Sequence, residues 1–314
     1  MIVEPLVTKI GELFLILFTA AALVKGRILK AEDSRVLSKL SLYFVTPCVI
    51  FNSFRKELTP EIGQGLLIAA GLAVGFHLLF FLLAEILRRL WKATEVERAS
   101  VVFTNAGNLI IPLVAYVFGE EWVIYTSAYI LVFNVLFWTV GVRMFDRENA
   151  PGLKKVLLNP NLLAIAAGLI MLFTRLPLPK PLGVAFEDVA QMIGPLSMMI
   201  TGLVVGGMKF RDLFANRRVF GVILFRMAAA SGIAVLAAVL FAAVSGITGS
   251  LASGRAIVMI PLLSAIAPSA SNINQVAILY NKDAKYASAI NVLTTLSCIL
   301  TIPLWVMLFD ALVK

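Results

Sequence analysis

The sequence is poor in charged residues. Of its 314 residues only 14% are Asp, Glu, Lys or Arg, whereas 60% are hydrophobic and the mean hydropathy is +0.95. Soluble domains carry roughly 25% charged and 45–50% apolar residues. The composition therefore argues against a soluble enzyme and indicates an integral membrane protein whose main partner is the lipid bilayer.

Residue types that build metal centres and active sites are also scarce. The chain has one histidine and two cysteines, and Cys48 and Cys298 lie in apolar runs where a thiol acts as a small core side chain. There is no H-E-x-x-H, no G-x-S-x-G and no pair of aspartates inside an apolar run. We therefore expect no enzyme activity, no metal site and no cofactor.

Long apolar runs dominate what is present. They are continuous rather than alternating, so they predict membrane-spanning α-helices, which need roughly 20 apolar residues each. The expected fold is an all-α polytopic membrane protein with ten transmembrane helices, at 5–24, 36–54, 63–87, 100–118, 122–145, 160–174, 184–207, 217–244, 255–279 and 285–309. The first run has no basic head or clear cleavage site, so we expect it to be retained.

The net charge of +9 is a topology signal rather than a sign of nucleic-acid binding. Eighteen of the 27 Lys and Arg residues fall in one set of alternate loops and seven in the other, with two inside spans. The positive-inside rule then places both termini outside and the 145–160 loop in the cytosol. Five spans starting outside precede five starting inside, which predicts an inverted repeat of 1–145 and 160–314 joined by a linker at 146–159.

Two spans are interrupted by polar residues and proline. The fourth contains T-N-A-G-N-L-I-I-P-L at 104–113, and we expect Pro112 to break its helix near the bilayer midplane beside Asn105, Gly107 and Asn108. Broken helices at the midplane indicate the binding site of a transporter.

The ninth span is the most polar, and we expect a second break at Pro268 followed by Asn272 and Asn274. If the two breaks converge, helix N-termini and amides offer a site that suits one carboxylate. Alternatively, the asparagines only satisfy the broken backbone.

Two further polar residues lie deep in apolar spans. Arg226 is expected either to attract an anion or to be structural, by snorkelling or by pairing with Glu85. His77 either takes part in coupling as a proton relay or is a hydrogen-bonded structural residue.

Three stretches resemble the auxin efflux carrier family. They are N-A-G-N-L-I-I-P, A-P-S-A-S-N followed by A-I-L-Y-N-K-D and Y-A-S-A, and S-K-L-S-L-Y-F-V-T-P at 38–47. The resemblance implies inverted five-helix repeats, a scaffold of helices 1, 2, 6 and 7, and a transport domain of helices 3–5 and 8–10. It also implies that helices four and nine cross, that the protein is a homodimer, and that its substrates are small organic anions such as indole-3-acetate, malate or malonate.

The same resemblance suggests individual site residues. Asn105, Pro112 and Pro268 fall on family positions, and Asn134 lies where relatives tend to carry an amide. Ile110 and Asn108 depart from the family pattern and reshape the pocket, so the substrate cannot be transferred from relatives.

We expect a secondary carrier of a small carboxylate in the plasma membrane, working by alternating access. One alternative is a Na⁺-coupled symporter of the bile-acid type, with Ser269, Ser271 and Asn272 as oxygen ligands. The other is a channel or a membrane ligand sensor.

Overall fold

The structure is a computed structural model that describes residues 3–55, 59–146, 157–175, 178–251 and 253–313. Within these ranges the chain is helical, and the one strand-like pairing is an antiparallel bridge between Thr104 and Ser269. Seven helical stretches are long and apolar enough to cross a membrane, and three shorter apolar helices accompany them. All fall on the runs expected from the sequence, so the all-α membrane fold is confirmed, whereas the ten spans and their inverted repeat stay predictions.

The helices have the following bounds. The α-helices are α1 Val3–Lys25, α2 Ser34–Leu40, α3 Thr46–Ser53, α4 Pro60–Trp91, α5 Glu95–Val102, α6 Ile111–Val117, α7 Val123–Leu136, α8 Val142–Phe145, α10 Pro160–Thr174, α11 Lys180–Gln191, α12 Ile193–Gly207, α13 Phe210–Leu213, α14 Arg218–Leu224, α15 Ser231–Ser245, α16 Ile247–Ser250, α17 Gly254–Ile266, α18 Asn272–Leu279 and α19 Ala284–Leu312. The π-helical turns are η2 Ser41–Val45, η3 Ala106–Ile110, η5 Phe137–Gly141 and η6 Phe225–Ala230, and the 3₁₀ turns are η1 Ala31–Asp33 and η4 Glu120–Trp122. Most of the expected 146–159 linker lies outside the described residues.

Local sequence explains the sharp turn between α4 and α5. The long helix α4 ends at Trp91, and the left-handed φ of 51° at the following Lys92 turns the chain. The next helix begins with a capping box, in which the Thr94 hydroxyl accepts from the Glu97 amide and the Glu97 carboxylate accepts from the Thr94 amide. This turn fixes where α5 enters the protein.

The first group of helices is built around α1 and α12. These two approach closely at glycines: a Cβ on Gly202 would lie 2.2 Å from the Leu17 carbonyl oxygen, and one on Gly206 would lie 2.7 Å from that of Ala21. Helix α2 also packs on α12, and α10 and α11 pack on α3. We call α1–α3 and α10–α12 the first group.

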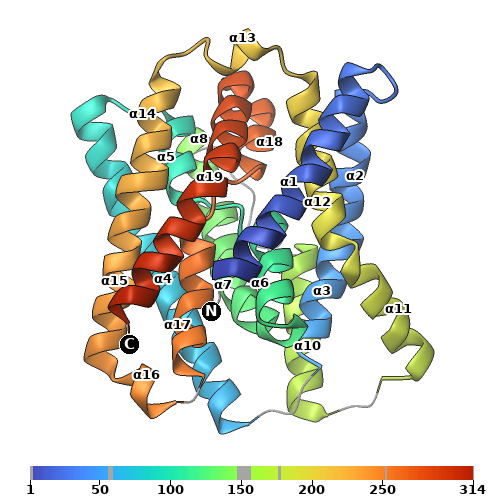
Figure 1. Ribbon diagram of the computed structural model, residues 1–314, viewed down its shortest axis with the longest axis vertical. Coiled ribbons are helices and arrows are strands. Elements are labelled where there is room, and N and C mark those ends of the chain that lie inside the picture. Colours follow the sequence, from blue (N-terminus) through green and yellow to red (C-terminus); the bar gives the residue numbers. More distant parts are fainter. Residues whose placement is uncertain (1–2, 56–58, 147–156, 176–177, 252, 314) are drawn as a thin grey trace.

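The second group surrounds the interrupted helices. Helix α4 packs on α5, α7 and α17, while α15 packs on α17 and α19, and α18 packs on α19. Figure 1 shows α5 and α17, which are far apart in sequence, on the same side of the molecule, with α1 and α12 on the other side. The start of α1 and the end of α19 both lie in the lower half of that view. We call α4–α8 and α14–α19 the second group.

Candidate functional site

Two helices of the second group are interrupted. Helix α5 ends at Val102 and η3 begins at Ala106, while α17 ends at Ile266 and α18 begins at Asn272. The residue after each first half is extended, with φ and ψ of −102° and 127° at Phe103. Both interruptions predicted from the sequence are therefore present.

The two interruptions meet and hydrogen-bond to each other. The backbone N–H of Asn105 donates to the Pro268 carbonyl at 2.8 Å, and the backbone N–H of Ala270 donates to the Phe103 carbonyl at 3.0 Å. Non-helical backbone survives at membrane depth only where protein or water covers it. Each interruption thus satisfies backbone groups that the other exposes, and we call this place the crossing.

The first break does not lie where the sequence predicted it. The chain is non-helical at Phe103–Asn105, well before Pro112. The π-helical turn η3 begins at Ala106 and runs directly into α6, so Pro112 lies inside a continuous helix rather than at its start. The first break therefore precedes its proline, whereas Pro268 lies inside its break as expected.

Three of the predicted asparagines lie at the crossing. Asn105 is buried, and the half-buried Asn108 donates from Nδ2 to the Ser271 hydroxyl at 3.4 Å. Asn272 is half-buried and begins α18 directly after Ser271. A Cβ placed on Gly107 would meet nothing within 4 Å, so there is open space where a side chain would lie at this position.

The other polar groups of the ninth span include the oxygens expected to ligate Na⁺. The Asn274 Oδ1 and Ser269 Oγ atoms are buried without hydrogen bonds, and Ser271 Oγ accepts from Asn108. Among the described residues, no group of three or more His, Cys, Asp or Glu could hold a metal ion. Ligation of Na⁺ by Ser269, Ser271 and Asn272 stays a prediction without a carboxylate to support it.

A fourth amide at the crossing, Asn291, was missed from the sequence. The Asn291 Nδ2 donates to the Ser269 carbonyl at 2.6 Å, and the Thr294 hydroxyl accepts from the Ser269 amide at 3.2 Å. In contrast, Asn134 donates to the Ile130 carbonyl of its own helix at 2.9 Å. An amide inside the last apolar run was the available signal, whereas Asn134 was singled out by the family resemblance.

Arg226 is fully buried and holds the end of α17. Its Nη2 donates to the carbonyls of Ala265 at 2.5 Å and Ala267 at 2.7 Å, and its guanidinium lies 4.9 Å from the centre of the Phe80 ring. Glu85 instead pairs with arginines of its own helix. The expected pairing of Arg226 with Glu85, and its snorkelling to the membrane surface, are therefore wrong: the arginine caps a helix C-terminus inside the protein.

His77 lies behind the first break. Its Nδ1 is 2.7 Å from the Ala73 carbonyl, and its ring lies 5.0 Å from that of Tyr129, whose hydroxyl accepts from Thr104 at 3.3 Å. Its Nε2 is buried without a partner. His77 is a hydrogen-bonded core residue in this conformation, and a proton-relay role stays a prediction.

A buried acid anchors the start of α5. The Glu97 side chain is 0% exposed, and Arg218 donates to it at 2.7 and 2.8 Å while the Tyr286 hydroxyl donates at 2.9 Å. Burial alone raises the pKa of this carboxyl, but hydrogen bonds from Arg218, the Thr94 amide and Tyr286 outweigh it and lower the pKa below its ordinary value. Glu97 is thus held ionised and ties α5 to α14 and α19.

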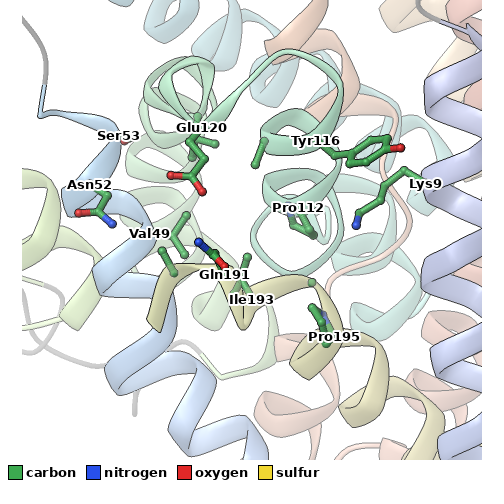
Figure 2. A pocket seen from close by; sticks show the side chains of 14 residues that line it. Lys9, Val49, Asn52, Ser53, Pro112, Tyr116, Glu120, Gln191, Ile193 and Pro195 are labelled. Atoms are coloured by element: carbon green, nitrogen blue, oxygen red, sulfur yellow. The ribbon is translucent and has the colours of Figure 1, made fainter. Parts of the chain in front are cut away.

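A cavity of about 250 Å³ lies between the two groups of helices, beside Pro112. It is lined by Lys9, Val49, Asn52, Ser53, Pro112, Ala115, Tyr116, Glu120, Val123, Ala190, Gln191, Ile193, Gly194 and Pro195. Figure 2 shows Pro112 near its centre, with Lys9 and Tyr116 together on one side and Glu120 on the other.

Two contacts join the helix groups at this cavity. The Lys9 ammonium lies 4.8 Å from the centre of the Tyr116 ring while it pairs with Glu12 at 2.8 Å. A Cβ on Gly194 would lie 3.1 Å from the Cβ of Pro112, so α12 and α6 nearly touch there. The second half of the interrupted fourth span therefore forms part of the boundary between the groups.

Comparison with known proteins agrees with the motifs. Residues 5–155 match the model of a family described as membrane transport protein, the auxin efflux carrier family. No curated protein matches the chain. The matched stretch includes the segment at 38–47 and the first interruption at 104–113, two of the three stretches that carry the resemblance. By this match, residues 5–155 are similar to the membrane transport protein family, which is the family of the auxin efflux carriers.

Proposed function

We propose that the chain is a secondary active transporter that moves a small organic anion across the plasma membrane by alternating access. The family match supports a membrane transporter. The crossing is the observation that carries the finer proposal, because two interrupted apolar helices are joined there by backbone hydrogen bonds. A span that only anchors a protein has no need for such a break.

The substrate class follows from the donors at the crossing. The side chains of Asn105, Asn108 and Asn272 are amides, which can donate to carboxylate oxygens. Each buried polar group without a partner costs roughly 1–3 kcal/mol, so a ligand that satisfies several of them gains affinity. Open space beside Gly107 leaves room for it. An aromatic monocarboxylate and a short dicarboxylate both have this chemistry.

The two helix groups suggest how the carrier moves. We assign the first group to the scaffold and the second to the transport domain, with the repeats at 1–145 and 160–314 contributing to both. The cavity between the groups and the close approach of Gly194 to Pro112 support a boundary along which they move. Helices four and nine travel with the transport domain and carry the site across the membrane.

Orientation and assembly are part of the same proposal. The loop cations place both termini outside and the 145–160 loop in the cytosol. The family resemblance suggests a homodimer. Cysteine accessibility from each side of intact cells and the mass of the purified protein in detergent test these two points separately.

Uptake by the purified full-length protein in proteoliposomes tests the function. Labelled malonate, malate and indole-3-acetate are offered with the unlabelled compound inside, with and without a Na⁺ or pH gradient. We expect saturable counterflow of at least one anion above that of protein-free liposomes. Uptake that requires Na⁺ would support the bile-acid-type symporter instead. Non-saturable flux would indicate a channel, binding without flux would indicate a sensor, and neither binding nor flux of any of the three would contradict the proposal.

A further inference from the structure

Four helix ends meet at the crossing, and their partial charges nearly cancel. The N-termini at Ala106 and Asn272 each carry about +0.5 of a charge, while the C-termini at Val102 and Ile266 each carry about −0.5. The two interrupted helices therefore bring as much negative as positive partial charge to the same place. The backbone alone gives an anion no net attraction.

Arg226 adds a full positive charge at this point. It is the largest fully buried side chain, and a guanidinium stays protonated in proteins. Among the ion pairs formed by the described residues, none includes Arg226. Its Nε and Nη1 atoms are buried without hydrogen bonds. Among the described residues, the guanidinium meets the carbonyls at the end of α17 and the face of the Phe80 ring, neither of which carries a formal charge, so the crossing as a whole is left positive.

The arginine lies near the backbone of Asn105 without a hydrogen bond to it. Its Nη2 binds the Ala267 carbonyl at 2.7 Å. The next carbonyl, that of Pro268, accepts from the backbone N–H of Asn105 at 2.8 Å. These contacts place the guanidinium within about 10 Å of the Asn105 backbone. The π-helical turn η6 holds it there, with the Ser231 hydroxyl donating to the Arg226 carbonyl at 3.0 Å.

We propose that Arg226 is an electrostatic positioning residue that supplies the net charge by which the crossing selects an anion, without contacting that anion. This inference rests on the proposed function. It differs from a purely structural cap in one measurable way. A charge acts on a ligand in proportion to the ligand's own charge, whereas a helix cap affects ligands of different charge equally.

Two probes of the same size separate these roles. Malonate carries two charges, and malonamate, in which one carboxylate is replaced by an amide, carries one. A unit charge at a separation of about 10 Å through an effective dielectric constant of about 20 changes an affinity roughly tenfold per unit of ligand charge. In counterflow assays, Arg226→Gln should therefore raise the apparent KM roughly tenfold for malonamate and roughly a hundredfold for malonate.

Matched variants identify the charge as the cause. Arg226→Lys keeps the charge and should keep the wild-type ratio of the two KM values. Arg255→Gln removes an arginine that pairs with Asp310 at the other end of α17, and the ratio should again be unchanged.

A second pair of variants covers the case in which Arg226→Gln does not fold. Phe80→Glu places a carboxylate beside the guanidinium and cancels its charge while Arg226 keeps its carbonyl partners. We expect Phe80→Glu, but not Phe80→Gln, to shift the KM ratio roughly tenfold against malonate.

The outcomes separate this inference from the function on which it rests. If wild-type protein transports neither probe, the malonate class of substrate is wrong and the inference falls with it, before any variant is compared. If wild-type protein transports both, and Arg226→Gln or Phe80→Glu weakens both equally or neither, the carrier stands and the electrostatic role of Arg226 is wrong.

Discussion

The two interruptions at the crossing solve the same problem with different chemistry. The break at 103–105 is held by aromatic packing, since the buried Phe103 ring lies 5.0–6.2 Å from the rings of Phe81, Phe133, Phe137 and His77. The break at 267–271 is held by side-chain donors, with Arg226 and Asn291 bonding its carbonyls. One break is therefore apolar and the other is polar and charged.

This difference indicates which part of the crossing gives stability and which part gives selectivity. Aromatic packing fixes the backbone without adding charge, so the first break is a rigid frame. Buried donors and a buried cation cost desolvation energy, and a protein keeps them where they orient or attract something. We expect changes to the aromatic rings that support the first break to act mainly on folding, and changes to the donors at the second break to act on both folding and transport.

Removal of the aromatic support should have the largest effect on stability. Phe103→Ala deletes a fully buried ring and leaves a cavity, which costs about 3–5 kcal/mol of unfolding free energy. Phe173→Ala, on a ring that is 67% exposed on α10, should cost less than about 0.5 kcal/mol. Denaturant unfolding of the two variants in detergent measures the difference, and similar costs would show that the first break does not depend on aromatic packing.

The bonds of Glu97 to Arg218 and Tyr286, which hold the start of α5, should have the next largest effect on stability. Glu97→Gln removes the charge that Arg218 and Tyr286 bind, and we expect a loss of about 2 kcal/mol, less than for a fully buried pair because Arg218 is 36% exposed. Thermal unfolding followed by tryptophan fluorescence measures the loss, with Glu121→Gln in the exposed turn η4 as the control.

The same anchor has a defined pH dependence. Hydrogen bonds hold the pKa of Glu97 below its ordinary value of about 4.3, so its contribution is fully present above that pH and is lost as the pH falls through the lower folded-state pKa. The stability difference between wild type and Glu97→Gln should therefore be constant from about pH 7 to 5 and shrink below about pH 4. A difference that shrinks already between pH 7 and 5 would mean that Glu97 is not held ionised.

The two mid-span asparagines should differ by a smaller amount. Asn291→Ala leaves the Ser269 carbonyl without its side-chain donor, which should cost about 1–2 kcal/mol. Asn134→Ala removes a donor to a carbonyl of its own helix and should cost about 0.5 kcal/mol. Equal losses of unfolding free energy would show that the second break does not need its donor from α19.

The smallest effect on stability is expected at the boundary between the groups. Gly194→Ala places a methyl 3.1 Å from the Cβ of Pro112, so the helices must shift by a few tenths of an ångström. We expect slower counterflow with a similar KM and a change in unfolding free energy below about 1 kcal/mol. Gly75→Ala, which meets no atom within 4 Å, should leave transport at the wild-type rate. A wild-type rate for Gly194→Ala as well would mean that this boundary does not slide.

Local patterns predicted much of the fold and part of the site. Apolar runs located the helices, and polar residues within two of them located both interruptions, with Asn105, Asn108 and Pro268 at the crossing. The position of the first break was wrong because a proline can kink a helix instead of breaking it, and Pro112 lies inside a helix that continues from the π-helical turn η3.

Long-range contacts could not be predicted in the same way. Arg226 binds carbonyls about forty residues away in α17, and any backbone carbonyl in the chain looks the same in the sequence. Asn291 carries the same local signal as Asn134, and only the packing of α19 against the break distinguishes them. A single sequence specifies which groups need partners inside a membrane but not which partners they find.

Counterflow of the anion transported by the wild-type protein, measured for Asn105→Ala in proteoliposomes, tests whether the crossing binds that anion. Asn161→Ala, on a buried asparagine at the start of α10 in the first group, is the control. We predict that Asn105→Ala remains folded, with a melting temperature close to that of Asn161→Ala, and loses saturable uptake, while the control retains it. Wild-type uptake by Asn105→Ala would contradict the claim that the crossing binds the transported anion.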